Sequence, residues 1–178
     1  VLLNGGTLDI AGTSNGASVH LLAGNGNVTL GAETLTLTNG TLSGNSANDN
    51  GGSIYTGASL RSSATVSLGS TILSAGASGG NFYHVGGTIT SLGYNLSSDD
   101  GGGFLTGTGD LLNTPPLLGP LTNNGGPTLT HALLPGSPAI DAGDPTFSPG
   151  SLPYDQRGPG FSRVFNGTVD IGAFEASP

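Results

Sequence analysis

Hydrophobic and polar residues alternate one by one in short stretches over the first hundred residues of the chain. In Thr34–Thr38 and in residues 64–68, aliphatic residues alternate with Thr or Ser, which puts the aliphatic side chains on one face of an extended backbone. These stretches are too short for helices, and Gly, Asn and Ser separate them. The pattern therefore predicts short β-strands with one dry face each. We expect them at residues 7–11, 18–22, 27–30, 34–38, 41–43, 53–56, 64–68, 71–74, 82–85, 88–90 and 94–96.

Similar segments recur along this region. Residues 51–55 (GGSIY) return 28 positions later as 79–83 (GGNFY), and residues 41–43 (TLS) return 30 positions later within 71–74 (TILS). A β-sandwich also has short alternating strands, but repeats of roughly 20 to 30 residues without a helix are typical of the coils of a parallel β-solenoid. The sequence therefore predicts an all-β fold, a right-handed parallel β-helix of about six to eight coils.

Proline is confined to the last third of the chain, where all 11 prolines follow Asn113. Because proline has no N–H to donate, central strands cannot contain so many of them. We expect residues 1–112 to form the solenoid coils and residues 113–178 to form Pro-rich terminal coils and long loops of the same domain. A closing strand is expected at residues 168–173. The expected apolar cover is Leu129, Ala132, Leu133, Leu134, Ala139 and Ile140.

The composition limits the partners and the chemistry. The chain has three basic residues, all Arg, against 11 acids, and its net charge is −8, so it has little with which to neutralise phosphate groups. We therefore expect neither nucleic acid nor an anionic membrane surface as a partner. Cysteine is absent, which excludes disulfides and thiolate nucleophiles. No apolar run approaches the roughly 20 residues of a membrane span, so membrane insertion is not expected.

The chain begins with Val1, Leu2 and Leu3 rather than with Met or a basic leader segment. We expect it to be a processed or excised part of a longer protein. An aliphatic start leaves the first coil of a solenoid without a polar cap, so upstream coils or a second subunit are expected to cover it. Repeated end-to-end stacking of subunits would give a filament.

The second half of the chain contains a series of motifs in unbroken order. They are residues 91–96 (SLGYNL), 109–111 (GDL), 116–121 (PLLGPL), 124–133 (NGGPTLTHAL), 136–143 (GSPAIDAG), 155–158 (DQRG) and 169–175 (VDIGAFE). This series resembles the bacterial choice-of-anchor Q domain proteins. The resemblance implies a secreted, right-handed parallel β-helix outside the cell or on its surface, and it implies no particular reaction. Residues 51–54 are also similar to a repeat of the chlamydial polymorphic outer membrane proteins, although the companion Phe-x-x-Asn repeat is missing.

The acids are the main candidates for chemistry. Asp141 and Asp144 lie in one Gly-containing loop and are the candidate ligands for Ca²⁺, although the full spacing of a Ca²⁺ loop is missing. The alternative is that both side chains accept backbone N–H bonds within the loop. No catalytic or cofactor-binding residues are assigned, because no acid or base has a recognisable partner.

Two of the three Arg residues lie among acids near the C-terminus. We expect this group to pair structurally and to pin the terminal loops, with substrate binding as the alternative interpretation. Its members are Asp155, Arg157, Arg163, Asp170 and Glu175.

The histidines are scattered, and the aromatic residues follow the repeats. His20 and His84 have no neighbour at metal-ligand spacing, and His131 is expected to be a hydrogen-bonded packing residue rather than a base. Four aromatic residues fall near equivalent positions of successive repeats and are expected to form a ladder, with a sugar-binding platform as the alternative. They are Tyr55, Phe82, Tyr83 and Tyr94.

Together these observations favour a non-catalytic extracellular protein with a structural, adhesive or matrix role, which includes self-assembly into a filament. Its expected partners are further copies of itself and extracellular polysaccharide or another surface component. The alternative is a carbohydrate-active enzyme, a polysaccharide lyase or hydrolase built on a β-helix. Acids converging in a cleft with an Arg would favour the enzyme.

Overall fold

The computed structural model describes residues 2–9, 17–20, 23–29, 34–48, 52–56, 64–150 and 152–177. In these residues the protein is nearly all β, and its single helical element is a 3-10 turn at Gly101–Gly103. The strands are β1 (Leu2–Asp9), β2 (Ala17–His20), β3 (Ala23–Thr29), β4 (Thr34–Thr38), β5 (Thr41–Asn45), β6 (Ile54–Thr56), β7 (Thr65–Gly69), β8 (Ile72–Ala75), β9 (Phe82–His84), β10 (Thr88–Gly93), β11 (Leu96–Ser97), β12 (Leu118–Thr122) and β13 (Thr130–Leu133). The prediction of an all-β chain is confirmed, and each expected strand in the first hundred residues overlaps one of β1 to β11.

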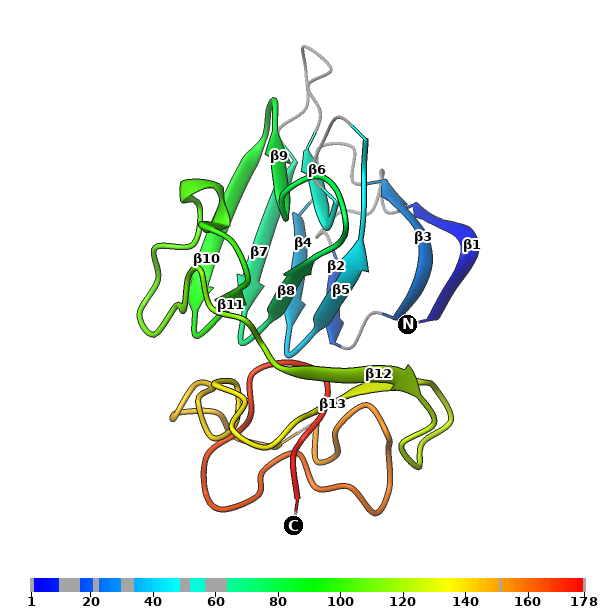
Figure 1. Ribbon diagram of the computed structural model, residues 1–178, viewed down its shortest axis with the longest axis vertical. Helices are drawn as coiled ribbons and strands as arrows, with labels where there is room; N and C mark the ends of the chain where they lie inside the picture. The colour runs from blue at the N-terminus through cyan, green and yellow to red at the C-terminus, as the bar shows by residue number, and fades with distance from the viewer. Residues whose placement is uncertain are drawn as a thin grey trace.

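The strands before residue 98 pair in parallel. One sheet has the order β10-β7-β4-β2, a second has the order β11-β8-β5, and β6 pairs with β9 (Figure 1). The chain visits these sheets in the same sequence twice, through β4, β5 and β6 and then through β7, β8 and β9. A fourth parallel sheet, formed by β1 and β3, lies beside them. This parallel arrangement does not fit an antiparallel sandwich.

The observed register confirms one sequence repeat and corrects the other. Ile54 and Tyr55 pair with Phe82 and Tyr83, as the 28-residue repeat predicts. Thr41, in contrast, pairs with Ile72 rather than with Thr71. Thr71 belongs to the preceding turn, where its Oγ1 donates to the Gly69 carbonyl at 2.9 Å, so the strand begins one residue later than its sequence suggests.

The predicted alternation produces the core of the parallel region. Leu35 and Leu37 of β4 are buried, as are Val66 and Leu68 of β7, while the Thr and Ser residues between them are partly exposed. These four side chains form one cluster with Ile54, Leu73 and Leu105. A second cluster, Ile72, Leu96, Leu133, Ala139 and Ile171, joins the parallel strands to the C-terminal residues.

The C-terminal region differs from the expected terminal coils. Strands β12 and β13 form an antiparallel pair, and the remaining described residues up to 177 are loops that lie below the parallel sheets in Figure 1. The expected strand at residues 168–173 is wrong. Its backbone bonds instead to three separate segments, because Val169 O accepts from Gly143, Ile171 donates to Ala139 and Gly172 donates to Ser70.

Part of the expected apolar cover is also corrected. Leu133 and Ala139 are buried, and Ala132 and Ile140 are partly buried, but Leu129 and Leu134 are largely exposed. The side chain that completes the cover is Ile171, which is fully buried. This segment lies close to β8 at Gly172, because a Cβ on Gly172 would be 2.7 Å from Ile72 Cδ1. The φ angle of Gly172 is +101°. Only glycine fits this approach without strain.

Replacing Leu68 with Ala tests the packing of the parallel region. Leu68 is fully buried in the central strand β7, so we expect Leu68→Ala to lower the free energy of unfolding by about 3 to 4 kcal/mol. The matched control is Leu121→Ala in β12, where 56 % of the residue is exposed and we expect a loss below about 1 kcal/mol. Urea unfolding of both variants measures the difference, and equal losses would contradict this packing.

Candidate functional site

Three strands of the parallel sheet end in the same unusual backbone conformation. Asn39 after β4, Ser70 after β7 and Tyr94 after β10 have positive φ angles of 53°, 46° and 55°. Asn39 N donates to the Gly69 carbonyl and Ser70 N donates to the Gly93 carbonyl, each at 3.0 Å. Asn adopts this left-handed region readily, whereas Ser and Tyr do so less often. Ser70 is held there by its bond to β10, and Tyr94 N donates to the Thr108 carbonyl at 2.8 Å. The three corners therefore lie in one column.

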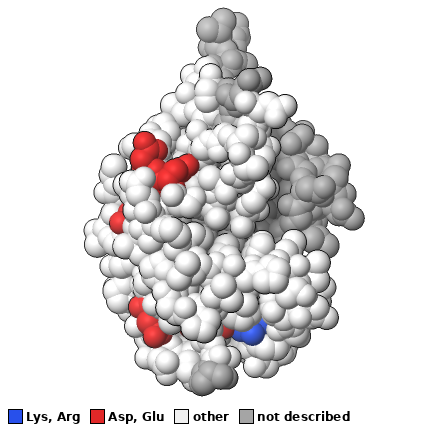
Figure 2. Space-filling view, viewed as in Figure 1, with Lys and Arg blue, Asp and Glu red and all other residues white. Residues whose placement is uncertain are grey.

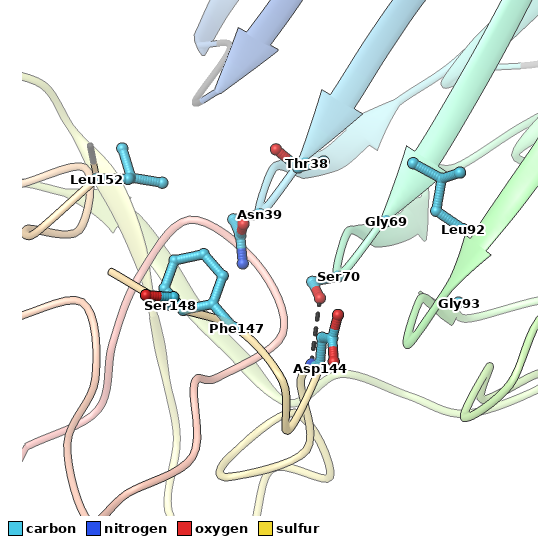
Figure 3. Close-up of a pocket in the computed structure, with 10 residues that line it drawn as sticks. All are labelled: Thr38, Asn39, Gly69, Ser70, Leu92, Gly93, Asp144, Phe147, Ser148 and Leu152. Atoms are coloured by element: carbon cyan, nitrogen blue, oxygen red, sulfur yellow. Dashed lines mark hydrogen bonds between the residues drawn. The ribbon is translucent and has the colours of Figure 1, made fainter. Parts of the chain in front are cut away.

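A loop from the C-terminal region packs against this column. Asp144 N lies 3.4 Å from Ser70 Oγ, and Gly143 N donates to Val169 O at 2.8 Å. The Asp144 carboxylate folds the loop locally, because Oδ1 accepts from the backbone N and the hydroxyl of Thr146 at 2.8 and 2.7 Å. Phe147 N then donates to Asp144 O, which brings the Phe147 ring over the corners (Figure 3).

The corners and the loop enclose a cleft with a volume of about 330 Å³, which we call the corner cleft. Its lining combines three apolar side chains, Leu92, Phe147 and Leu152, with five polar side chains and two glycines. Asn39 is only 3 % exposed, and its Nδ2 has no hydrogen-bond partner in the part of the chain that the structure describes. The residues that define the chemistry of the cleft are Asn39, Ser70, Leu92, Asp144, Phe147 and Leu152 (Figure 3).

The two candidate Ca²⁺ ligands have different surroundings. Asp144 lines the corner cleft, whereas Asp141 is exposed and its backbone N donates to Asp170 Oδ1 at 2.7 Å. Among the described residues, no group of three or more His, Cys, Asp or Glu side chains is placed to hold a metal ion. A Ca²⁺ site here would need most of its six to eight oxygens from backbone and water, so the metal assignment stays a prediction.

Two acids close the last parallel turn. Asp110 accepts from Asn95 N at 2.8 Å and from Gly107 N at 2.7 Å. Asp99 accepts from Asn81 N at 2.6 Å and from Gly101 N at 3.0 Å. Burial acts to raise the pKa of Asp99, but these hydrogen bonds and one from Ser97 outweigh it and lower the pKa. Both carboxylates therefore accept hydrogen bonds from backbone N–H groups and fix the loops around them.

One of the two Arg residues near the C-terminus pairs with an acid as expected. Arg157 forms an ion pair with Asp155, with Nη2 and Oδ2 2.6 Å apart, and both side chains are buried. The guanidinium lies between the rings of Phe161 and Phe174, at 4.0 and 3.8 Å from their centroids. Its Nη2 also donates to the Glu175 carbonyl, so this cation fixes the last residues of the fold.

The second Arg is buried without a paired carboxylate. Arg163 Nη2 donates to the carbonyls of Asp170 and Gly172, while Nε and Nη1 have no partner among the described residues. The Glu175 carboxylate accepts from Phe165 N and Asp170 N at 2.9 and 3.0 Å. Burial raises the pKa of Glu175 to about 7, and it also raises the pKa of Asp170 and lowers that of Arg163. The sequence placed these residues together but could not show their burial.

Two of the histidines make hydrogen bonds. His131 Nδ1 lies 2.7 Å from the Gly119 carbonyl, which fits the expected packing role, and His84 Nδ1 lies 2.7 Å from Thr56 Oγ1. The side chain of His20 lies outside the described residues.

The aromatic ladder is shorter than expected. Tyr55 and Tyr83 stack with centroids 5.8 Å apart and an interplanar angle of 2°, and both are exposed. Phe82 packs instead against Phe104, and Tyr94 lies in the column of corners. The ladder therefore consists of two tyrosines on the surface.

Charged residues make up 8 % of the sequence, and few of them are visible on the face in Figure 2. Figure 2 shows a face that is mostly uncharged, with separate acidic spots and one small basic spot. No helix in the described residues is long and apolar enough to cross a membrane.

Comparison with known proteins gives no relative. No family model matches the chain, and no curated protein and no solved structure matches it. The site must therefore be interpreted from its own chemistry.

The raised pKa of Glu175 predicts a pH-dependent stability. The folded state holds its proton up to about pH 7, whereas the unfolded state releases it near 4.5. The stability that Glu175 contributes is therefore full below pH 4.5 and is lost as the pH rises through about 7, by on the order of 3 kcal/mol. Asp170, whose pKa is also raised, acts in the same direction.

Urea unfolding across this pH window checks the prediction. The wild-type free energy of unfolding should fall between about pH 5 and pH 8, and Glu175→Gln should flatten much of that slope, because Gln does not titrate. The isosteric control is Asp100→Asn, an exposed acid that holds one loop amide, Gly102 N. Equal slopes in the wild type and Glu175→Gln would contradict the assignment.

Proposed function

We propose that this chain is a non-catalytic β-solenoid module that acts outside the cell or on its surface in a structural or adhesive role. In this proposal the parallel sheets are the faces of a right-handed parallel β-helix, and each coil contributes one strand to each face. The observation that carries the proposal is the repeated path of the chain, in which β7, β8 and β9 follow and pair with β4, β5 and β6.

The use of the acids supports a structural role. The carboxylates of five acids accept bonds from backbone N–H groups at places where the regular pairing stops. They are Asp99, Asp110, Asp155, Asp170 and Glu175. A catalytic acid must instead reach a substrate, so these side chains serve the fold.

The composition supports exposure outside the cell. Three Arg and no Lys leave few sites for trypsin-like proteases, and the absence of Cys and Met leaves little to oxidise. The motif series between residues 91 and 175 is similar to that of secreted choice-of-anchor Q domain proteins and favours the same location.

Self-association is part of the proposal. In the described residues β1 pairs on one side with β3, and an unpaired strand edge is a template for another chain. A head-to-tail contact of this kind does not close on itself and would give fibres.

Enzyme assays separate this proposal from the carbohydrate-active alternative. Incubation with pectic, alginate and glucan polymers should release no reducing ends and no unsaturated products, because the five acids named above are bound to backbone. The informative variants are Asp141→Asn and Asp144→Asn. Turnover by the wild type that either change abolishes would overturn the non-catalytic assignment.

Sedimentation at increasing concentration tests the association. We expect the sedimentation coefficient to increase with concentration and fibres to be visible by electron microscopy. The β1 amides should also gain protection against hydrogen exchange. A strictly monomeric protein at all concentrations would contradict the end-to-end contact and would leave the scaffold assignment standing.

A further inference from the structure

The corner cleft is lined by Asn39, whose buried side-chain donor the fold leaves without a partner among the described residues. We propose that it binds one neutral sugar residue, with a hydroxyl group accepting from Asn39 Nδ2, a hydroxyl group donating to the Asp144 carboxylate and the ring lying against Phe147. This binding site goes beyond the structural role proposed above and does not depend on it.

The Asn39 side chain shows what the ligand must offer. Its Nδ2 is a buried donor without a partner in the described residues, and Figure 3 shows it on the side of the cleft near Phe147 and Ser70. A buried donor that lacks an acceptor is costly, so the occupant must bring a lone pair. An ammonium group has none and therefore does not satisfy Asn39.

The charge of the cleft excludes an anion. Asp144 is the one charged side chain among the described lining residues, and its Oδ2 accepts no hydrogen bond from them. With no Lys or Arg in the lining and a chain charge of −8, a carboxylate or phosphate on the ligand would be repelled. A hydroxyl group can accept from Asn39 and donate to Asp144, and a sugar carries several of them.

The size and the apolar wall fit a single pyranose ring. The volume of about 330 Å³ lies at the lower end for small-molecule sites, and the cleft is open on one side, so the rest of a glycan chain can remain in solvent. Phe147 supplies apolar surface for the C–H face of a ring, and Leu92 and Leu152 lie on opposite sides of it (Figure 3). This combination of one apolar face and a rim of hydroxyl partners is the chemistry of a neutral sugar.

Titrations followed by ¹H–¹⁵N NMR on the complete chain test the proposal. The probes are the methyl pyranosides of glucose, galactose, mannose and N-acetylglucosamine, with glucuronate and choline as charged comparators. At least one neutral pyranoside should shift the Asn39 side-chain amide and the Ser70 and Asp144 backbone signals. Asn39→Asp keeps the size of the side chain and its tolerance of positive φ but removes the donor, and Phe147→Ala removes the apolar wall. Each should weaken binding about tenfold or more.

The matched control is Tyr83→Ala, which removes half of the exposed tyrosine ladder and should leave the affinity unchanged. Binding that is lost in Tyr83→Ala and kept in Phe147→Ala would move the sugar site to the ladder and overturn the proposal. Preference for choline or glucuronate would also overturn the proposal. The absence of any shift with the neutral pyranosides would overturn it too, because Asn39 would then bind only water. Thermal unfolding of each variant shows whether it is folded. If Asn39→Asp does not fold, the binding result of Phe147→Ala decides the test.

Discussion

The parallel region depends on the hydrogen bonds that two of the corner residues, Asn39 and Ser70, donate to the carbonyl at the end of the next strand. Asn39 N donates to the Gly69 carbonyl and Ser70 N donates to the Gly93 carbonyl. Each of these two chain reversals is therefore fixed by a bond to the adjacent strand. The left-handed conformation that these corners require is unfavourable for Ser and Tyr in isolation. Because the bonds align the corners, the following strands β5, β8 and β11 begin in register, and Thr41 and Leu96 both pair with Ile72.

Where the repeat stops, buried charge replaces strand pairing. After Leu111 no further parallel strand occurs in the described residues, and the backbone N–H groups of the terminal loops find carboxylates instead. Asp155, Asp170 and Glu175 accept such bonds, and Arg157 and Arg163 offset part of their charge. The group works as a unit, since desolvating so many charges is favourable only when each has partners. The raised pKa of Glu175 indicates that this compensation is incomplete.

Local patterns were enough to predict the strands but not the C-terminal packing. The alternation in Thr34–Thr38 and in residues 64–68 predicted both the strand and its buried face, because that information lies in adjacent residues. Residues 168–173 were expected to be a strand from their composition, but their partners Ala139, Gly143 and Ser70 are far away in sequence. The corner cleft was missed for the same reason: Asn39 and Phe147 are more than a hundred positions apart, and no spacing rule connects them.

The cleft lies where the repeated and the irregular parts of the chain meet, and this position has a physical cause. Parallel strands in register give a regular wall, on which each corner repeats its neighbour and leaves no hollow large enough for a ligand. The loop that begins at Asp144 follows no such repeat. It contacts the column through Ser70, and its residues Phe147 and Leu152 line the cleft. The mismatch creates the space, and the corner residue Asn39, which needs its backbone for the sheet, is left with a free side-chain donor inside it. A chain made only of identical coils would offer neither the space nor the donor, so a specific binding site requires the irregular C-terminal region.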